Sequence, residues 1–256
     1  MEQNFAKKIL LITGATSGIG KATALRFSQA GAGIAAVGRN EQALLELQKQ
    51  LGAAAEFLPI RADLSQAEAA DTVVAKTAER FGGIDVLVNA AGHISTGTIE
   101  NTSPEAWDKM LEINLRTPFL LMQKALPTII ERRGNIVNVS SVTGLRSFPG
   151  VLAYCVSKSG LDQLTRCAAL ELAAKGVRVN AVNPGVVVTE IHKRGGMTET
   201  EYAAFLEHSK TTHPLGRVGK AEEVAELIFF LASDAASWIT GGTYSIDGGR
   251  ALTCAR

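Results

Sequence analysis

Regular structure begins at KKILLITGATSGIGKATALRFSQAG, residues 7–31, and this stretch decides the fold. Ile9 to Ile12 form an apolar run that ends at Thr13-Gly14, which predicts a strand over residues 7–13 that is buried on both faces. Three glycines follow at G-x-x-x-G-x-G spacing, and a helix is predicted from about residue 19 to residue 30, closed by Gly31. A buried strand, a glycine turn and a helix in this order predict the first unit of a parallel sheet covered by helices.

The rest of the chain repeats this alternation. Further strands are predicted at residues 33–38, 56–61, 84–88, 135–139, 177–182 and 243–246, about seven in all. Helices are predicted at residues 41–51 and 67–81, from 104, from about 113, and at 152–174 and 221–231. Residues 190–214 are polar and are interpreted as irregular. With no linker or repeat, residues 1–256 are expected to form one α/β domain, a doubly wound parallel sheet with helices on both faces.

Composition and charge argue against several classes of protein. The chain is 46% hydrophobic with a net charge of +1, which does not favour nucleic acid or an anionic membrane as the main partner. No apolar run approaches the roughly 18 residues that a membrane span needs. Cys155, Cys167 and Cys254 form no CxxC pair, so neither disulfides nor a metal site is indicated. Because residues 1–8 do not resemble a signal peptide, a reduced, cytoplasmic setting is expected.

The glycine turn is suited to a dinucleotide. Glycine lets a backbone approach a pyrophosphate closely, and the helix that follows presents free N–H groups and a favourable dipole. In an open parallel sheet, ligands bind beyond the carboxyl ends of the strands, where the strand order reverses. The spacing departs from the common G-x-G-x-x-G pattern, so a tight turn without a ligand is the alternative. The position directly after the first strand favours a cofactor.

The end of the second predicted strand bears on the choice of cofactor. An acidic residue there would bind the 2′-hydroxyl of NAD, whereas an arginine can accommodate the 2′-phosphate of NADP. Here the sequence is Val37-Gly38-Arg39-Asn40, with no acid before Glu41. Arg39 is a permanently charged donor suited to phosphate, so NADP(H) is favoured and NAD(H) remains possible. A loop arginine that faces solvent is the structural alternative.

A second motif, Tyr154-x-x-x-Lys158, follows the predicted fifth strand. Four residues apart on a helix, the two side chains share one face. A cation beside a phenol stabilises the phenolate, so Lys158 is expected to lower the pKa of Tyr154 and make it a usable general acid/base. Ser141 follows the preceding strand and is placed to hydrogen-bond the same reacting oxygen. Cys155 is expected to be an ordinary apolar helix residue, not a nucleophile.

Together these residues resemble the short-chain dehydrogenase/reductase family, of the one-domain kind that includes the 3-oxoacyl-carrier-protein reductases. The motifs, in order, are Thr13-Gly14-x-x-x-Gly18-x-Gly20, Asn89-Ala90-Ala91-Gly92, Asn114, Ser141, Tyr154-x-x-x-Lys158, Pro184-Gly185 with Thr189, Pro214-Leu215-Gly216-Arg217 and Asp247-Gly248-Gly249. Ala90 departs from the family, which usually has Asn at that position. The resemblance covers residues 7–249 and implies a Rossmann-type fold and NAD(P)-dependent interconversion of a carbonyl and a secondary alcohol.

The resemblance also implies catalytic roles. Tyr154 would be the acid/base, Ser141 would polarise and orient the carbonyl, and Lys158 would lower the tyrosine pKa and bond the nicotinamide ribose. Asn114 would hold a water on a proton path from Lys158. A local backbone hydrogen bond is the alternative for Asn114.

A cofactor site follows from the same resemblance. Asp63 and Leu64 would lie at the adenine, and Thr189 with the backbone around Val187 at the carboxamide. Asn89 would bond near the adenosine ribose and the sheet. The expected cofactor-binding residues are Gly14, Thr16, Ser17, Gly18, Ile19, Gly20, Arg39, Asp63, Leu64, Asn89, Ala90, Gly92, Tyr154, Lys158, Pro184, Gly185, Val187 and Thr189.

The substrate is open at this point. The resemblance makes residues 190–214 a lid over a mostly apolar pocket, with walls expected from His93, Ile94, Val142, Leu152 and Val186. Arg132 and Lys175 occupy positions where the 3-oxoacyl reductases keep basic residues for an acidic carrier. An NADPH-dependent ketone or 3-oxoacyl reductase is favoured. The alternatives are an NAD-dependent sugar, polyol or steroid alcohol dehydrogenase and a non-catalytic nucleotide-binding sensor.

The resemblance further implies a homotetramer. Relatives usually pair two long helices, here about residues 113–132 and 152–174, and the last strand. The second helix carries an apolar stripe of Leu161, Leu164, Ala168 and Leu172 that suits such a contact. The same stripe could face the sheet of its own chain.

Overall fold

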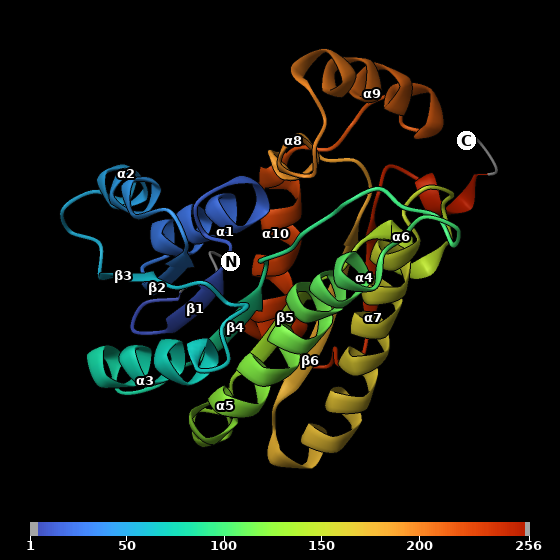
Figure 1. The fold of residues 1–256 in the computed structure, drawn as a ribbon. Helices are drawn as coiled ribbons and strands as arrows, with labels where there is room; N and C mark the ends of the chain where they lie inside the picture. Colours follow the sequence, from blue (N-terminus) through green and yellow to red (C-terminus); the bar gives the residue numbers. More distant parts are fainter. Residues whose placement is uncertain (1–4, 254–256) are drawn as a thin grey trace.

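The computed structural model describes residues 5–253, which form a seven-stranded parallel sheet between two layers of helices (Figure 1). The strands are β1 (Ile9–Thr13), β2 (Gly33–Gly38), β3 (Phe57–Arg61), β4 (Val86–Asn89), β5 (Asn135–Val139), β6 (Arg178–Pro184) and β7 (Thr243–Ile246). Their order in the sheet is β3-β2-β1-β4-β5-β6-β7. The predicted doubly wound sheet is therefore confirmed. Cys254 lies outside the described residues.

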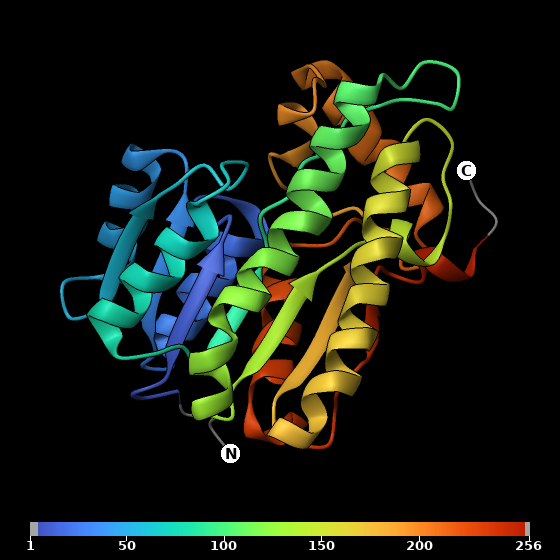
Figure 2. The same cartoon turned by 60° about the horizontal axis from the view of Figure 1, so that its bottom comes forward.

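Helices cover both faces of the sheet. One layer contains α1 (Gly18–Gln29), α2 (Glu41–Leu51) and α10 (Ala221–Ala232). The other contains α3 (Ala69–Phe81), α5 (Thr117–Glu131) and α7 (Leu152–Leu172), which lie in front of the strands in Figure 2. The first and last thirds of the chain thus meet on one face, because α1 packs directly against α10.

Strand β1 shows why the strands are apolar without alternation. Leu10 and Ile12 belong to the core beneath α1 and α10, whereas Leu11 belongs to the core beneath α3 and α5. Successive side chains point to opposite faces, so a strand covered on both sides is mostly apolar rather than alternating. All five residues of β1 are accordingly buried.

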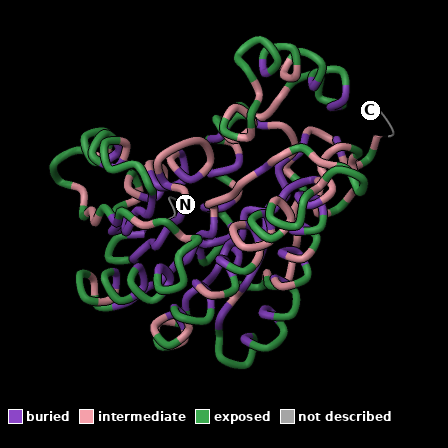
Figure 3. Tube along the Cα trace, viewed as in Figure 1, coloured by how far each residue is buried: buried purple, intermediate pink, exposed green. Residues whose placement is uncertain are grey.

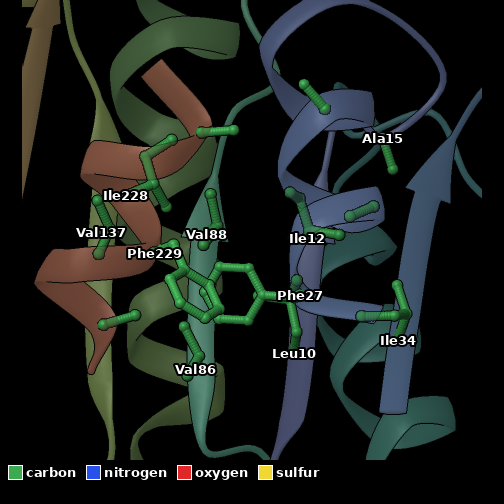
Figure 4. Close-up of a cluster of buried hydrophobic side chains, with 14 of the residues drawn as sticks. Leu10, Ile12, Ala15, Phe27, Ile34, Val86, Val88, Val137, Ile228 and Phe229 are labelled. Atoms are coloured by element: carbon green, nitrogen blue, oxygen red, sulfur yellow. The ribbon is translucent and has the colours of Figure 1, made fainter. Parts of the chain in front are cut away.

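Aromatic rings fill the core between α1 and α10. Phe27 of α1 and Phe229 of α10 pack edge to face with ring centroids 5.1 Å apart (Figure 4). Phe5 lies 4.7 Å from each of them. On the opposite face, Ala168 and Leu172 of α7 are buried among sheet residues, with Leu164 packed against them. The stripe on α7 therefore faces the sheet of its own chain.

The expectation that residues 190–214 are irregular is wrong. This segment contains α8 (Ile191–Arg194) and α9 (Glu199–Thr212). Helix α9 starts with a capping box, in which the Thr198 side-chain oxygen accepts from the Glu201 N–H and the Glu201 carboxylate accepts from the Thr198 N–H. Three of its 14 residues are buried, so it lacks the apolar stripe that reveals a helix from sequence. Figure 3 shows α9 largely exposed.

The remaining helices agree with the predictions or refine them. α4 (Pro104–Leu111) begins at the predicted proline, and its N-cap Ser103 accepts from the Ala106 N–H at 3.2 Å. A π-helical turn, Glu112–Arg116, joins α4 to α5, so the helix predicted from residue 113 continues an earlier one. The short α6 (Val142–Leu145) follows β5, and 3₁₀ turns cover Ala173–Lys175, Asp234–Ala236 and Arg250–Leu252. Across residues 5–253 there is no helix with the length and apolarity to cross a bilayer.

Candidate active site

A cavity of about 1140 Å³ lies at the carboxyl ends of the strands. Figure 2 shows the strand arrows pointing toward the end where α8 and α9 lie. The turns after β1 and β4, where the strand order reverses, form part of its wall. Every residue expected to bind the cofactor lines this cavity except Asn89. Ser141 lines it as well, and Asn114 lies behind the wall.

The glycine turn fits a closely approaching phosphate group. Gly14 has a φ of +65°, and a Cβ there would lie 2.8 Å from the Ala90 carbonyl oxygen. A Cβ on Gly20 would overlap the Gly14 carbonyl. Ser17 caps α1 without a side-chain hydrogen bond, and the first turn holds no acidic side chain. The N–H groups at the start of α1 therefore remain available to an anion, as a dinucleotide pyrophosphate requires.

Asn89 bonds within the sheet, as expected in part, and its place near the adenosine ribose stays a prediction. Its side chain lies inside the sheet, where Nδ2 donates to Asn138 Oδ1 at 2.8 Å, and the residue is 2% exposed. The link between the two turns comes from Thr13, whose hydroxyl oxygen accepts from the N–H groups of Ala90 and Ala91, each at 3.1 Å. Asn89 thus joins neighbouring strands below the cavity floor.

Tyr154, Lys158 and Ser141 come together on the cavity wall. Tyr154 and Lys158 lie in the first two turns of α7, and Ser141 caps α6 directly after β5. The phenol shares a hydrogen bond with Ser141. Lys158 Nζ donates to the Val139 carbonyl oxygen at 2.8 Å and lies 5.7 Å from the centre of the Tyr154 ring. The predicted grouping of these three side chains is present.

Burial dominates the protonation of this group. It raises the pKa of Tyr154 to about 12, although the hydrogen bond with Ser141 acts in the opposite direction. Burial also lowers the pKa of Lys158 to about 8, partly offset by the charge of Asp162. In the chain by itself the pKa of Tyr154 is therefore raised overall, and the lowering expected from Lys158 stays a prediction. The cost of removing a phenolate from water exceeds the effect of an ammonium that points at a backbone carbonyl.

Asn114, in the π-helical turn, forms hydrogen bonds with both backbone groups of His93. Its Oδ1 accepts from the His93 N–H at 2.9 Å, and its Nδ2 donates to the His93 carbonyl oxygen at 2.8 Å. Nδ2 also lies 3.1 Å from the hydroxyl oxygen of Ser157 on α7. The local backbone bond raised as an alternative for Asn114 is thus made, and it fixes the loop after β4 against α7.

Two residues behind the site were missed by sequence reasoning. Asn183 Nδ2 donates to the Ser141 carbonyl oxygen and to Asp162 Oδ2, each at 2.9 Å. Asp162 lies one helical turn beyond Lys158 and is 1% exposed. Burial raises its pKa, while hydrogen bonds from Ser140 and Asn183 counteract this. The i, i+4 spacing from Lys158 to Asp162 was the signal available in the sequence.

The far end of the cavity differs in part from the expected walls. His93, Ile94, Val142 and Val186 line it as expected, whereas Leu152 does not and Val151 does. Arg146, Phe148, His208 and Arg250 also line it, and sequence reasoning named none of them.

Arg132 and Lys175 lie at the opposite end of the sheet from this cavity. Arg132 pairs at 3.1 Å with Asp85, which directly precedes β4. Lys175 ends the turn that leads into β6. Their role in receiving an acidic carrier stays a prediction.

Comparisons with known proteins agree with this geometry. The family model described as Enoyl-(Acyl carrier protein) reductase matches residues 14–251. The 3-oxoacyl-[acyl-carrier-protein] reductase FabG of Thermotoga maritima is 42% identical, over 94% of this chain and 97% of that protein. The 2,5-dichloro-2,5-cyclohexadiene-1,4-diol dehydrogenase LinX of Sphingobium indicum is 36% identical, over 97% and 98%. A Caenorhabditis elegans short-chain dehydrogenase/reductase of unknown function, solved with cofactor, has a TM-score of 0.92, with 36% identity and 97% coverage of both chains.

Fold, cavity and comparisons define the class of protein, an NAD(P)-dependent oxidoreductase that interconverts a carbonyl and an alcohol. The chain belongs to the short-chain dehydrogenase/reductase family.

Proposed function

We propose that this enzyme is an NADPH-dependent reductase of a ketone or 3-oxoacyl compound, with Tyr154 as its general acid. The buried phenol of Tyr154 carries the proposal, because it shares a hydrogen bond with Ser141 on the wall of the cavity that the glycine turn also lines. The 3-oxoacyl reductase at 42% identity supports this substrate class. The diol dehydrogenase at 36% identity favours the second candidate, oxidation of an alcohol with NAD.

The reaction divides between cofactor and protein. A bound reduced nicotinamide supplies the hydride that adds to the carbonyl carbon. Tyr154 donates a proton to the carbonyl oxygen, and its raised pKa keeps the phenol protonated at neutral pH. The Ser141 hydroxyl oxygen accepts from the Thr143 N–H at 3.1 Å, which fixes the oxygen, and the hydroxyl proton that Ser141 shares with Tyr154 turns to the developing oxyanion when substrate binds.

Lys158 and Asn114 are proposed to return a proton to Tyr154. The side chain of Lys158 is mostly charged at neutral pH because its pKa, although lowered, remains about 8. The point where a Cβ on Gly92 would stand is 3.5 Å from Asn114 Oδ1 and 3.9 Å from Lys158 Nζ. Glycine at this position keeps open a space between them, which supports the predicted water on a proton path.

The preference for NADPH is proposed from Arg39. This residue directly follows β2, lines the cavity and is exposed. The neighbouring Asn40 does not compete for its role, because the Asn40 side chain caps α2 by accepting from the Ala43 N–H at 3.1 Å. A guanidinium at this place is suited to the 2′-phosphate of NADP(H).

We also propose a homotetramer in a cytoplasmic setting. The free thiols Cys155 and Cys167 are compatible with a reducing compartment. Trp238 is 99% exposed and Leu170 is 82% exposed, which favours burial of both between copies of the chain.

The Tyr154→Phe variant tests the proposed function. We expect it to lower kcat by about 10²–10⁴-fold on a panel of 3-oxoacyl thioesters, ketones and sugars, while NADPH binding survives. Parallel kinetics with NADPH and NADH on the same panel test the cofactor and the substrate class together. Tyr244→Phe is the matched control, since Tyr244 lies in β7 and does not line the cavity. Unchanged turnover in Tyr154→Phe would overturn the proposal.

A further inference from the structure

Three cations from distant parts of the chain line one region of the cavity. Arg39 follows β2, Lys109 lies in α4, and Arg194 ends α8 within the lid. All three act on His93, whose pKa is lowered first by burial and then by the charges of Lys109, Arg39 and Arg194. Burial, followed by the charge of Arg39, also lowers the pKa of Arg194. The lid therefore brings a guanidinium into the field of the cations at the cofactor end of the cavity.

One carboxylate partly offsets these cations, since the pKa of Asp63 is lowered first by hydrogen bonds from Ser65 and then, against burial, by the charges of Arg39 and Lys109. Asp63 is the one acidic side chain among the described residues that line the cavity, and it accepts from the Ser65 N–H at 3.1 Å and from the Ser65 hydroxyl at 2.8 Å.

Of the two adjacent cations in the lid, Lys193 is paired with carboxylates and Arg194 is not. Lys193 pairs with Glu190 at 3.0 Å and with Glu199 at 3.1 Å. The charge of Glu190 acts on Arg194, but the two form no ion pair. Within residues 5–253, none of Arg194, Arg39 and Lys109 forms an ion pair. The acidic residues of the lid thus neutralise Lys193 and leave the charge of Arg194 to an anion in the cavity.

We propose that Arg194 binds a phosphate group of the dinucleotide from the lid side, so that the cofactor joins the lid to the cations of the sheet. This inference rests on the proposed use of NAD(P)(H). Guanidinium groups donate charge-assisted hydrogen bonds to phosphate oxygens, and a phosphate between Arg194 and Arg39 removes their mutual repulsion. Because Arg194 ends α8 in the lid and Arg39 directly follows β2, a phosphate bound by both holds the lid to the sheet. The 2′-phosphate occurs in NADP(H) alone, whereas the pyrophosphate occurs in both cofactors.

Dissociation constants of the Arg194→Gln variant for NADPH and NADH, followed by nicotinamide fluorescence, test the inference. We expect NADPH to bind about tenfold more weakly or worse, because a charge-assisted hydrogen bond is lost. A loss confined to NADPH assigns Arg194 to the 2′-phosphate, and an equal loss with NADH assigns it to the pyrophosphate. Lys210→Gln is the matched control, because it removes the same charge from α9, where Lys210 pairs with Glu207 and does not line the cavity.

Protease protection of the lid supplies a second measurement that does not depend on turnover. NADPH is expected to slow cleavage within residues 190–214 of the wild-type chain, and to do so less in Arg194→Gln. If Arg194→Gln binds both cofactors as tightly as wild type and its lid is equally protected, this inference is overturned and the proposed function stands. If wild type binds neither cofactor, the proposed function fails, and the inference fails with it.

Discussion

At the scale of single residues, burial moves Tyr154 and Lys158 toward their neutral forms. The pKa of Tyr154 rises from 10.0 to about 12, and that of Lys158 falls from 10.5 to about 8. Tyr154 therefore has a higher pKa than Lys158 and stays protonated at neutral pH, as a general acid that protonates an oxyanion must be. A sequence shows that a cation is one turn away, but it does not show how little water remains around either group.

Lys158→Met tests the cost of burying this ammonium. Because the pKa of Lys158 is lower in the folded chain, the unfolded chain binds its proton more tightly. The loss of folding free energy that comes from burying the charged lysine is complete below pH 8 and disappears as the pH rises toward 10.5. We expect the variant to raise the free energy of unfolding at pH 7 by about 1–3 kcal/mol, measured by urea denaturation, and to lose activity.

The pH dependence separates this cause from others. The difference in the free energy of unfolding between Lys158→Met and wild type should shrink between pH 8 and 10.5. Lys210→Met changes an exposed lysine, so its difference from wild type should not change over this range. A Lys158→Met chain that is less stable than wild type at pH 7 would contradict this account.

At the scale of elements, the site depends on pieces of helix that carry weak signals in the sequence. The π-helical turn directs Asn114 at the backbone of His93, and no apolar pattern marks such a turn. Helix α9 is tied to the cofactor wall by Tyr202, whose hydroxyl donates to the Thr189 carbonyl oxygen at 2.8 Å and accepts from the Thr189 N–H at 3.1 Å. Further contacts hold α9 as well, including the ion pair between Lys193 and Glu199 and the packing of the His192 ring against Phe205.

Thr198→Ala removes the capping box of α9. The change should weaken α9 locally by about 1 kcal/mol, because a backbone N–H loses its partner. We expect faster amide hydrogen exchange in α9 and a higher KM for the cofactor, with little change in the global unfolding midpoint. Ser103→Ala removes the cap of α4 and is the matched control for loss of a cap outside the lid. A variant that lowers the global midpoint and leaves exchange in α9 unchanged would refute this prediction.

At the scale of the whole molecule, the sheet was predictable because its signals are local. A strand buried on both faces, such as Gly33–Gly38, is a continuous apolar run. Gly33–Gly38, Asn135–Val139 and Thr243–Ile246 have the predicted bounds. Placement across the fold was harder. Whether Asn89 points into the cavity, or whether Arg132 lies beside it, depends on strand direction and packing, which motif spacing does not contain. Likewise, the stripe on α7 showed an apolar face without showing which surface covers it.

Oligomeric state is the prediction that belongs to this scale. We expect sedimentation to give a mass four times that of the 27.0 kDa chain. Trp238→Glu places a charge on an almost fully exposed ring that we propose to be buried between copies, so the variant should dissociate to smaller species. Leu45→Glu, on α2, is the control and should leave the mass unchanged. A monomeric wild-type chain would refute the tetramer.

The contact between Phe27 and Phe229 has a consequence for biosynthesis. The two rings lie about 200 residues apart in the sequence, as do their neighbours Arg26 and Glu226, which form an ion pair at 2.6 Å. A ribosome adds residues at roughly 5–20 per second, so α1 is made on the order of 10–40 s before α10. Until α10 leaves the exit tunnel, the part of α1 that packs on Phe229 lacks that partner, although β1, β2 and α2 already contact α1. This face of the core is therefore completed only after most of the chain has been synthesised.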